Sequence, residues 1–388
     1  SDTTVRNAYG HRAADGGRSA CRGCSMSVSG TQATQSTKEP ANGPLGEARH
    51  VRFLFLTIGP IIAALITSGL ILVAFGINPI TYYIFVIQKG LFSSLGLEQT
   101  LTRMAPLLFL AAGLIVSFRA GIWNLGIDGQ FLLGAVASAA LAPALLGVVP
   151  GWLMLLLGFA LAALVGAIWS ILPALLRAYQ GVNEIITTLM MTFLGVSLAN
   201  VLVKLIFLDP GTTVPQTRTL PVVDRLPRLF DTTISSGLIW ALGAVLLVHL
   251  VMTRTAFGLK LRTVGANPLA AAHAGLSVPR LTTAVFALSA GFAGLAGASE
   301  ILGVNGNVPA DWNPAYGLMV IPLVFLARFH GVGSIVLVFF YSALLIGSES
   351  AARRVGVPQD FTLVLVATLL IFLGLAEWLD HRRRKGSG

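Results

Sequence analysis

Residues that can hold a metal ion or act as nucleophiles are few and scattered in this sequence. Cys21 and Cys24 form a CxxC pair, which has the spacing of half a zinc site or of a redox pair. No further cysteine is present to complete a closed zinc site, so we expect the pair to be incidental and predict no metal or other cofactor. His249 has no partner at a spacing that indicates catalysis, which argues against a hydrolase.

Nucleotide chemistry is missing as well. A phosphate-binding P-loop needs a lysine followed by serine or threonine, and no lysine in the chain has such a neighbour. The lysines are Lys38, Lys89, Lys204, Lys260 and Lys385. We therefore expect that the chain is not an enzyme. If its action depends on ATP, we expect the hydrolysis to occur in a separate protein.

Most of the chain is apolar enough to lie in a lipid bilayer. Hydrophobic residues make up 55% of it, charged residues 11%, and the mean hydropathy is +0.80. An apolar helix needs about 20 residues to cross roughly 30 Å of hydrocarbon, where lipid offers the backbone no hydrogen-bond partner. The sequence therefore predicts an all-α polytopic membrane protein with about ten transmembrane helices. The predicted spans are Phe53–Phe75, Leu101–Phe118, Gln130–Leu146, Trp152–Leu176, Glu184–Phe207, Leu238–Met252, Leu281–Gly303, Tyr316–Phe329, Ser334–Glu349 and Phe361–Leu379.

The positive charges favour one orientation of these spans. Loops rich in Lys and Arg tend to stay in the cytoplasm, and the basic clusters at both ends and between the sixth and seventh spans fall on one side. We therefore expect cytoplasmic termini. Arg353 and Arg354 fall on the outer side, where they bind a partner unless the span count is wrong by one. The formal net charge of +10 then faces anionic lipid and implies no nucleic-acid partner.

The chain divides into three parts by composition. Residues 1–48 are rich in Ser, Thr, Gly and Ala and predict a disordered cytoplasmic N-terminal tail. Residues 49–380 form the transmembrane domain, and residues 381–388 form a basic C-terminal tail. Translation is expected to begin at Met26, because the residues before it lack the apolar core of a signal peptide.

Polar residues at the start of two spans are candidates for lining a path through the membrane. Asn124 and Gln130 lie in a glycine-rich segment before the third span, where Asp128 is expected to complement the dipole of its own helix. Asn183 and Glu184 open the fifth span. They act either as residues of an inner gate or as a helix cap with a favoured first-turn charge.

A further polar cluster follows the seventh span on the outer side. Asn305, Trp312 and Asn313 can stack on a solute and hydrogen-bond it, although a loop that docks a partner protein would have the same composition. The next span, Tyr316–Phe329, is short and contains Pro322, which indicates a broken helix beside a path near the membrane midplane.

Two other features concern packing and partners. In the seventh span, Ala290, Gly294 and Ala298 recur at every fourth residue and predict close helix contacts. The loop of residues 253–280 is long and basic, with Pro268 able to start a short helix and Gly275 able to end it. Such a helix offers a separate motor protein a surface to bind.

Together these segments resemble the permease subunits of ATP-binding-cassette importers, in the superfamily that includes branched-chain amino acid and ribose permeases. The nucleoside and simple-sugar branch is the most similar. The resemblance covers most of residues 101–378 and rests on GIWNLGIDGQ at 121–130, GVNEIITTLM at 181–190, TAFGLKLRTVGANPLAAAHAGL at 255–276 and LSAGFAGLAGASEILGV at 288–304.

The resemblance implies a permease in a bacterial inner membrane that forms half of the translocation path for a nucleoside or simple sugar. Its expected partners are ATPase subunits, a second permease subunit, an extracytoplasmic solute-binding protein and the lipid bilayer. Residues 253–280 then form the cytoplasmic coupling loop of the permease domain, and its ATPase-docking residues are Arg262, Gly265, Asn267, Ala271 and Gly275. Asp128 departs from the Glu common in the family, and the loop spacing is shorter, so individual docking contacts are not carried over.

Two alternatives stay open at this point. One is an ion-coupled secondary transporter of a small polar solute, which the sequence disfavours because Lys204 and Glu349 lie near span ends and only His249 lies deeper. The other is an ATP-binding-cassette permease for a different solute, such as branched-chain amino acids. The sequence does not decide which solute is carried, or whether the permease pairs with itself or with a related chain.

Overall fold

A computed structural model of the chain describes residues 44–229 and 232–355, together with 361, 363–365, 367–368, 371–372 and 374–376. Helices dominate these residues, and the extended pairings among them are isolated bridges such as Leu208 with Thr217. The predicted all-α class is confirmed for this part of the chain.

The helices follow one another with mostly short connections. They are α1 (Pro44–Ala74), α2 (Pro79–Ile87), α3 (Ser94–Arg119), α4 (Ile127–Leu145), α5 (Gly151–Trp169), α6 (Ile171–Gln180), α7 (Glu184–Val201), α8 (Gly237–Arg254), α9 (Ala256–Ala266), α10 (Pro268–His273), α11 (Val278–Glu300), α12 (Tyr316–Leu326) and α13 (Gly331–Val355). Three π-helical turns extend α2, α7 and α11, and a 3-10 turn lies before α8. They are η1 (Gln88–Phe92), η2 (Leu202–Ile206), η4 (Ile301–Asn305) and η3 (Val222–Asp224).

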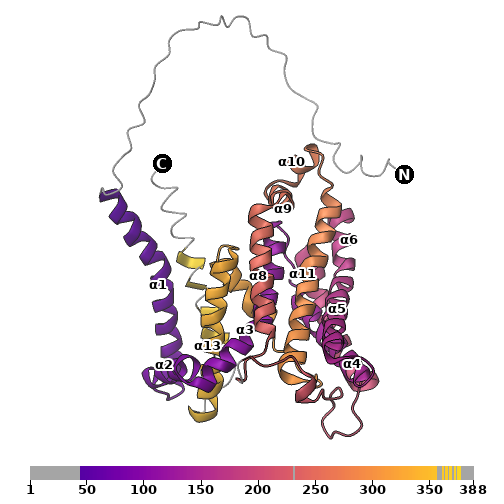
Figure 1. The fold of residues 1–388 in the computed structure, drawn as a ribbon. Helices are drawn as coiled ribbons and strands as arrows, with labels where there is room; N and C mark the ends of the chain where they lie inside the picture. The colour runs from indigo at the N-terminus through magenta and orange to yellow at the C-terminus, as the bar shows by residue number, and fades with distance from the viewer. Residues whose placement is uncertain are drawn as a thin grey trace, which may run out of the picture. The chain divides into compact units, whose positions relative to one another are not determined.

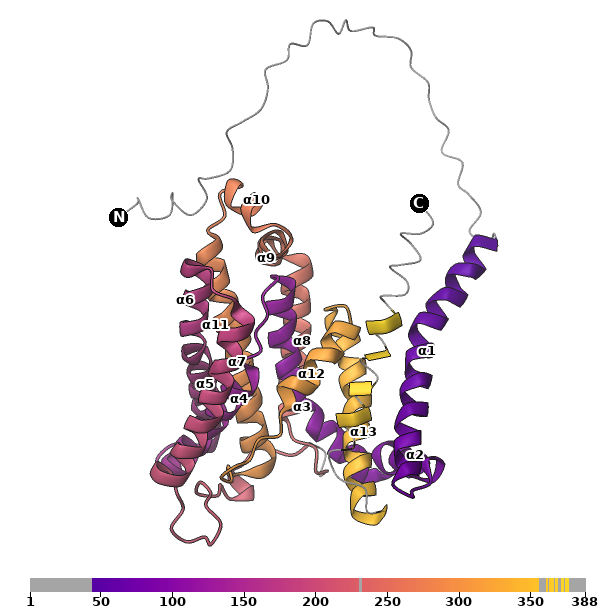
Figure 2. The same ribbon diagram turned by 180° about the vertical axis from the view of Figure 1, so that it is seen from behind.

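The two ends of the helical bundle differ in charge. Helices α9 and α10 lie at one end and α2 at the other (Figures 1 and 2). We call the end with α9 and α10 the basic end and the end with α2 the opposite end. The residues that make the first end basic lie in or beside α9 and α10 and are Arg254, Lys260, Arg262 and Arg280.

Seven helices in the described part of the chain are long and apolar enough to cross a membrane, some of them with their extensions or together with the next helix. They are Ser94–Arg119, Ile127–Leu145, Gly151–Gln180, Glu184–Ile206, Gly237–Arg254, Val278–Asn305 and Gly331–Arg354. The segments Gly59–Ala74 and Pro79–Phe92 bend by 119° and give an eighth crossing if counted as one span. The described residues therefore support a multi-pass helical protein with seven or eight such spans, and the number of about ten is not confirmed.

The remaining differences from the predicted spans concern short helices. Helix α12, predicted as a span over Tyr316–Phe329, ends at Leu326 and is 11 residues long, too short to cross the hydrocarbon alone. The segment Pro79–Phe92 was not predicted as an element, because its apolar run is shorter than a spanning helix. The predicted tenth span, Phe361–Leu379, falls partly outside the described residues.

The limits of the predicted tails also need one correction. Helix α1 begins at Pro44, so residues 44–48 are helical rather than part of a disordered tail. Residues 1–43, with the CxxC pair, and the basic tail 381–388 lie outside the described part of the chain.

Helix α11 packs at backbone distance against its neighbours α4 and α5. A Cβ atom at Gly294 would overlap the carbonyl oxygen of Ala162 in α5, and one at Gly134 in α4 would lie 2.6 Å from the Cα of Gly294. Ala290 and Ala298 on the same helix are fully buried. The small-residue pattern of the seventh span is therefore confirmed as a packing signal, since helices in lipid gain stability from close van der Waals contact.

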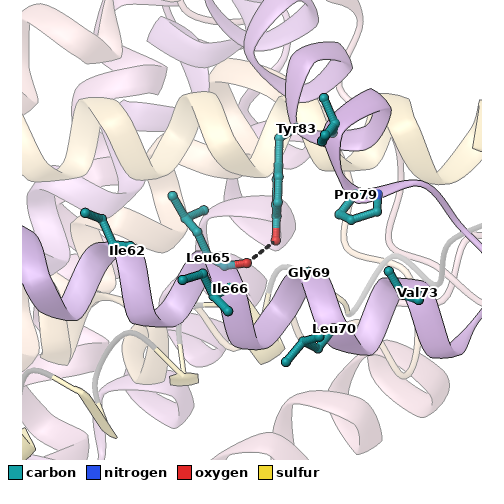
Figure 3. Close-up of a pocket in the computed structure, with 9 residues that line it drawn as sticks. Ile62, Leu65, Ile66, Gly69, Leu70, Val73, Pro79 and Tyr83 are labelled. Atoms are coloured by element: carbon teal, nitrogen blue, oxygen red, sulfur yellow. Dashed lines mark hydrogen bonds between the residues drawn. The ribbon is translucent and has the colours of Figure 1, made fainter.

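An apolar groove lies between α1 and α2 (Figure 3). It is lined by Ile62, Leu65, Ile66, Gly69, Leu70, Val73, Pro79, Ile80 and Tyr83. The Tyr83 hydroxyl donates a hydrogen bond of 2.9 Å to the carbonyl of Leu65, which ties the two helices together near their bend. The lining suits a lipid chain or another apolar helix and not a polar solute.

The packing of α11 leads to a stability prediction. Gly294→Ala places a methyl group against the α5 backbone, so we expect the free energy of unfolding to fall by about 1–3 kcal/mol. Unfolding by SDS in mixed micelles measures the change. Gly291→Ala is the matched control, because the nearest atom to its new Cβ lies 3.6 Å away. Equal effects of the two substitutions would contradict the predicted backbone contact.

Candidate functional site

A non-helical segment runs into the interior of the bundle between α3 and α4. Residues 121–126 leave the helical path after a turn at Gly121, whose φ of +70° favours glycine. Asn124 at its centre is fully buried and donates a 3.1 Å hydrogen bond to Ser289 Oγ. Ser289 lies about 16 Å along α11 from the first residue of that helix. Irregular backbone thus lies at membrane depth, where it must be satisfied by protein or by a water-filled cavity.

Side chains from α4 and α7 satisfy this segment. Asn124 and Gln130 exchange two amide hydrogen bonds of 3.0 and 3.3 Å. The Leu125 N–H donates to Thr188 Oγ1 at 3.2 Å, and Thr192 Oγ1 donates to the Leu125 carbonyl at 2.9 Å. The structure therefore brings Asn124 and Gln130 together, and it gives them the direct role of holding an irregular loop inside the bundle.

Asp128 begins α4 but caps a different helix. Its carboxylate accepts a 2.6 Å hydrogen bond from the N–H of Gly317 in the first turn of α12. The N-cap residue of α12, Ala315, has a left-handed φ of 52° and its side chain forms no capping hydrogen bond. The sequence assigned Asp128 to the dipole of its own helix. In the structure the carboxylate stabilises the N-terminus of α12, where free N–H groups and the helix dipole favour negative charge.

A charged cluster on α3, α11 and α12 was missed in the sequence. Arg103 Nη1 donates a 2.7 Å hydrogen bond to Glu300 Oε1, and it also hydrogen-bonds the hydroxyl of Tyr316. Glu300 and Tyr316 are buried. The available signal was an arginine inside the predicted second span, since a charge within an apolar helix marks a functional position by default. With Asp128, these residues also show that the deep ionisable groups are more numerous than the sequence argument allowed.

The predicted outer-side residues take different positions around this cluster. Asn305 Nδ2 donates to Glu300 Oε1 at 3.3 Å, which places it in the cluster. Trp312 packs against the ring of Phe131 with centroids 5.9 Å apart. Asn313 is exposed and accepts a 3.0 Å hydrogen bond from the Ala315 N–H, so it shapes the turn before α12.

The loops at the opposite end are held by a separate arginine. Arg225 Nε donates to the Leu220 carbonyl at 3.0 Å, and Nη1 donates to the Val304 carbonyl. Burial and the neighbouring Arg228 lower the pKa of the Arg225 guanidinium. Gly306 follows with a φ of +77°, and a Cβ there would overlap this guanidinium. These bonds join the 220 loop to the end of α11.

Asn183 and Glu184 have local contacts at the basic end. Asn183 is exposed, and its Oδ1 accepts a 2.9 Å hydrogen bond from Ile185 N as the N-cap of α7. Glu184 forms a 3.2 Å ion pair with Arg177 at the end of α6. The capping interpretation therefore accounts for their geometry, and a part in a gate stays a prediction.

The predicted coupling loop forms two short helices. Asn267 caps α10 by accepting hydrogen bonds from Leu269 N and Ala270 N at 3.0 and 3.1 Å. Gly275 follows the helix with a left-handed φ of +82°, so the helix predicted between Pro268 and Gly275 is confirmed. Ala271 is fully buried. Three of the five loop residues are thus explained by the shape of α10.

The two other loop residues differ from each other. Arg262 is exposed on α9 and is free to meet a partner. Gly265 instead lies against the end of α3, where an added Cβ would approach Arg119 O and Ala120 C at 2.8 Å. The same close approach is seen from Gly121, whose Cβ would meet the Cα of Gly265 at 3.0 Å. Gly265 therefore packs α9 closely against the end of α3, and its part in ATPase docking stays a prediction.

His249 does have a neighbour in the structure. Its ring lies 4.4 Å from that of His330, centroid to centroid, where α13 begins. Within the described residues, no group of three or more His, Cys, Asp or Glu side chains is placed to hold a metal ion. Two imidazoles without a third ligand do not form a typical zinc site.

Comparison with known proteins identifies the family. Residues 96–374 match the family described as the permease component of the branched-chain amino acid transport system. This match covers well over half of the chain. The chain belongs to this family. Membership in a family of transport permeases accounts for the long apolar helices.

Three curated relatives extend along most of this permease. The glucose ABC transporter permease protein of Haloferax volcanii is 33% identical over 336 residues, which covers 83% of this chain and 87% of the relative. The nucleoside ABC transporter permease protein NupB of Lactococcus lactis is 27% identical, covering 81% of this chain and 89% of its own length. The guanosine ABC transporter permease protein NupP of Bacillus subtilis is 26% identical, with coverage of 84% and 94%.

The contact between α4 and α12 is testable in the permease. Asp128→Ala leaves the Gly317 N–H buried and without its acceptor, so we expect a loss of about 1–3 kcal/mol in the free energy of unfolding. Asp128→Asn keeps an acceptor oxygen in place and should retain most of the stability. SDS unfolding in mixed micelles compares both with the unmodified permease. An alanine variant as stable as the asparagine variant would show that the cap contributes nothing.

Proposed function

We propose that this chain is one permease subunit of an ATP-binding-cassette importer and forms half of the path by which a sugar or nucleoside crosses the membrane. The observation that carries the proposal is the similarity, over most of the chain, to permeases named for glucose and for nucleosides. The family match to a transport-system permease component supports the same class. The expected partners are ATPase subunits, a second permease and a solute-binding protein.

The charge of the basic end supports an orientation. Exposed Arg254, Lys260 and Arg262 lie on α8 and α9 at that end, and positive loops remain in the cytoplasm. We place the basic end and both termini in the cytoplasm and the protein in the inner membrane. We propose about ten crossings, made by the seven long helices, the bent pair, the segment from Phe361, and α12 together with the residues up to Gly331, because α12 alone is too short to cross.

The proposed path follows the polar interior. Asn124 and Gln130 lie at its deep, irregular segment, and Asn305 and Trp312 lie toward the opposite end beside the buried charges. Asn313 marks the entry turn before α12, and Asn183 and Glu184 mark the exit at the basic end. Polar groups and broken backbone at membrane depth are typical of transport paths.

The contact between α9 and the irregular segment supports a way of coupling. Gly265 of α9 and Gly121 approach each other at backbone distance. A displacement of α9 by an ATPase therefore reaches residues 121–126 without a flexible linker between them. In this account Arg262, beside Gly265 on the exposed part of α9, meets the ATPase directly, while Asn267, Ala271 and Gly275 set the shape of α10.

A secondary transporter is retained as the second candidate because of one observation. Arg103, Asp128 and Glu300 are ionisable groups inside the helical bundle, and ion-coupled transporters use such groups to bind protons or sodium. The curated relatives named as ABC transporter permeases favour the first candidate.

Transport in proteoliposomes separates the two candidates. The permease is reconstituted with its ATPase, sister permease and binding protein, and uptake of radiolabelled glucose and guanosine is measured. Uptake should require the binding protein, and it should require ATP on the side of the membrane where the ATPase lies. Uptake of either solute driven by a proton or sodium gradient through this chain alone would replace the importer with the secondary transporter.

The docking role of α9 is tested by charge reversal. We propose that Arg262 meets an acidic group of the ATPase, so Arg262→Glu should lower copurification of the ATPase by about tenfold or more through repulsion of like charges. Arg218→Glu carries the same change in charge on an exposed loop at the opposite end and should leave copurification unchanged. An undiminished ATPase yield with Arg262→Glu would remove this residue from the interface. Gly265 is not used here, because its replacement disturbs the packing of α9 on α3.

A further inference from the structure

The charged cluster of Arg103, Glu300 and Tyr316 toward the opposite end has hydrogen-bond donors and acceptors that its own contacts leave unused. Arg103 joins Glu300 and Tyr316 through Nη1, and within the described residues its other nitrogens make no hydrogen bond. Glu300 Oε1 accepts from Arg103 and Asn305, whereas Oε2 is buried without a hydrogen-bond partner in the described part of the chain. A buried carboxylate oxygen without a donor is costly, so this one indicates a missing donor.

The cluster also holds two carboxyl groups against one guanidinium. Glu349 of α13 is half-buried and near enough to interact electrostatically with both Arg103 and Glu300. One guanidinium thus faces two carboxylates from different helices. A neutral solute that offers hydroxyl donors fits this balance better than an anion does, because hydroxyl hydrogens satisfy carboxylate oxygens without adding negative charge.

Access to the cluster comes from the side of Arg103. The Arg103 side chain is 23% exposed, while that of Glu300 is fully buried. Arg103 lies on α3 between the outer part of that helix and its buried apolar stretch from Met104 to Phe118. Lipid cannot solvate a guanidinium, so the exposed part faces water in a path or at a boundary with another subunit.

The backbone changes at this point as well. The α-helical hydrogen bonding of α11 ends at Glu300, and the π-helical turn η4 begins at the next residue, Ile301. Such turns are frequent at functional sites, because they change the direction in which neighbouring side chains leave the helix. Tyr316, across the cluster, adds an aromatic face 5.7 Å from the Arg103 guanidinium.

We propose that Arg103, Glu300 and Tyr316 form a solute subsite that binds hydroxyl groups of a neutral, polyhydroxylated solute on its way through the permease. Because Glu300 is enclosed in the structure described, we place this contact in a state of the transport cycle in which the helices have parted around the solute. There Glu300 Oε2 accepts from one hydroxyl, and the free N–H groups of Arg103 donate to an adjacent hydroxyl oxygen. This inference rests on the proposed function and adds the residues that contact the solute. It assigns no such contact to the Lys204–Asp311 ion pair, which lies at 2.8 Å and is exposed.

The test separates a solute subsite from a structural ion pair. Arg103→Met with Glu300→Leu replaces the pair by apolar residues of similar size, a change that is often neutral or stabilising for a buried ion pair. Lys204→Met with Asp311→Asn is the control for the exposed pair, because asparagine tolerates the left-handed φ of 59° at position 311. Uptake of radiolabelled glucose and guanosine is measured with the fully reconstituted importer, together with ATPase copurification and thermal stability.

We expect the Arg103/Glu300 double variant to assemble with its ATPase and to lose uptake by about tenfold or more, because apolar groups cannot pair with solute hydroxyls. The Lys204/Asp311 variant should transport normally. Assembly with normal uptake by the Arg103/Glu300 variant would overturn the subsite and leave only a structural pair. Absence of ATP-dependent uptake by the unmodified importer would instead overturn the proposed function.

A milder variant decides the case if the double variant does not assemble. Tyr316→Phe removes one hydroxyl and leaves the ion pair intact. We expect it to raise the KM for the transported solute severalfold with little change in the maximal rate, since it loosens the position of Arg103. Uptake of the solute is also compared with uptake of its deoxy analogues. If the unmodified protein discriminates against the deoxy analogues more strongly than the variant does, direct recognition of the hydroxyl is supported. An unchanged KM and unchanged discrimination would overturn it.

Discussion

The structure depends on one constraint, which is that every backbone N–H and C=O group at membrane depth must find a partner within the protein or in enclosed water. Regular helices meet this constraint without help. Residues 121–126 do not, and there the hydroxyls of Thr188 and Thr192 in α7 and the Asn124 side chain bond the backbone of Leu125 and Gly126. Gln130 of α4 and Ser289 of α11 hold the Asn124 side chain in place. The same requirement explains Asp128, which supplies an acceptor to the start of a helix whose own residues provide none.

The hydrogen bonds of the irregular segment and of Asp128 connect the two ends of the bundle. At the basic end, α9 lies at backbone distance from the turn at Gly121. From there the irregular segment leads to Asn124, and α4 leads through Asp128 to the first turn of α12. Tyr316 in that turn belongs to the charged cluster toward the opposite end. A continuous chain of packed and hydrogen-bonded elements thus runs between the proposed ATPase contact and the proposed solute subsite, and it is the physical connection that the proposed coupling would use.

Part of this was predictable from sequence, for physical reasons that are specific to each element. Long apolar runs predict helices in lipid because length and hydropathy alone decide them, and the small residues around Gly294 predict backbone contact by their spacing. Pro268, Asn267 and Gly275 carry local capping signals, so α10 was predictable as well. Short elements such as α2 and the true length of α12 depend on tertiary contacts, which periodicity does not contain.

The candidate site was harder to predict than the fold. Asn124 and Gln130 were selected for polarity in a glycine-rich segment, but their partner Ser289 is distant in sequence. Arg103 was passed over, because an arginine near the start of an apolar span looks like a boundary residue until its contact with Glu300 is known. Gly265 was assigned to the coupling loop through the resemblance, but its close contact with the backbone of α3 depends on the tertiary fold, which the loop sequence does not contain.

Amide hydrogen exchange of residues 121–126 in the reconstituted permease tests the central claim most directly. The account predicts that the Leu125 and Gly126 amides exchange slowly although they lie outside any helix, because Thr188 Oγ1 and Asn124 Oδ1 accept their hydrogen bonds inside the bundle. Rapid exchange at both amides, as fast as in an open surface loop, would contradict it.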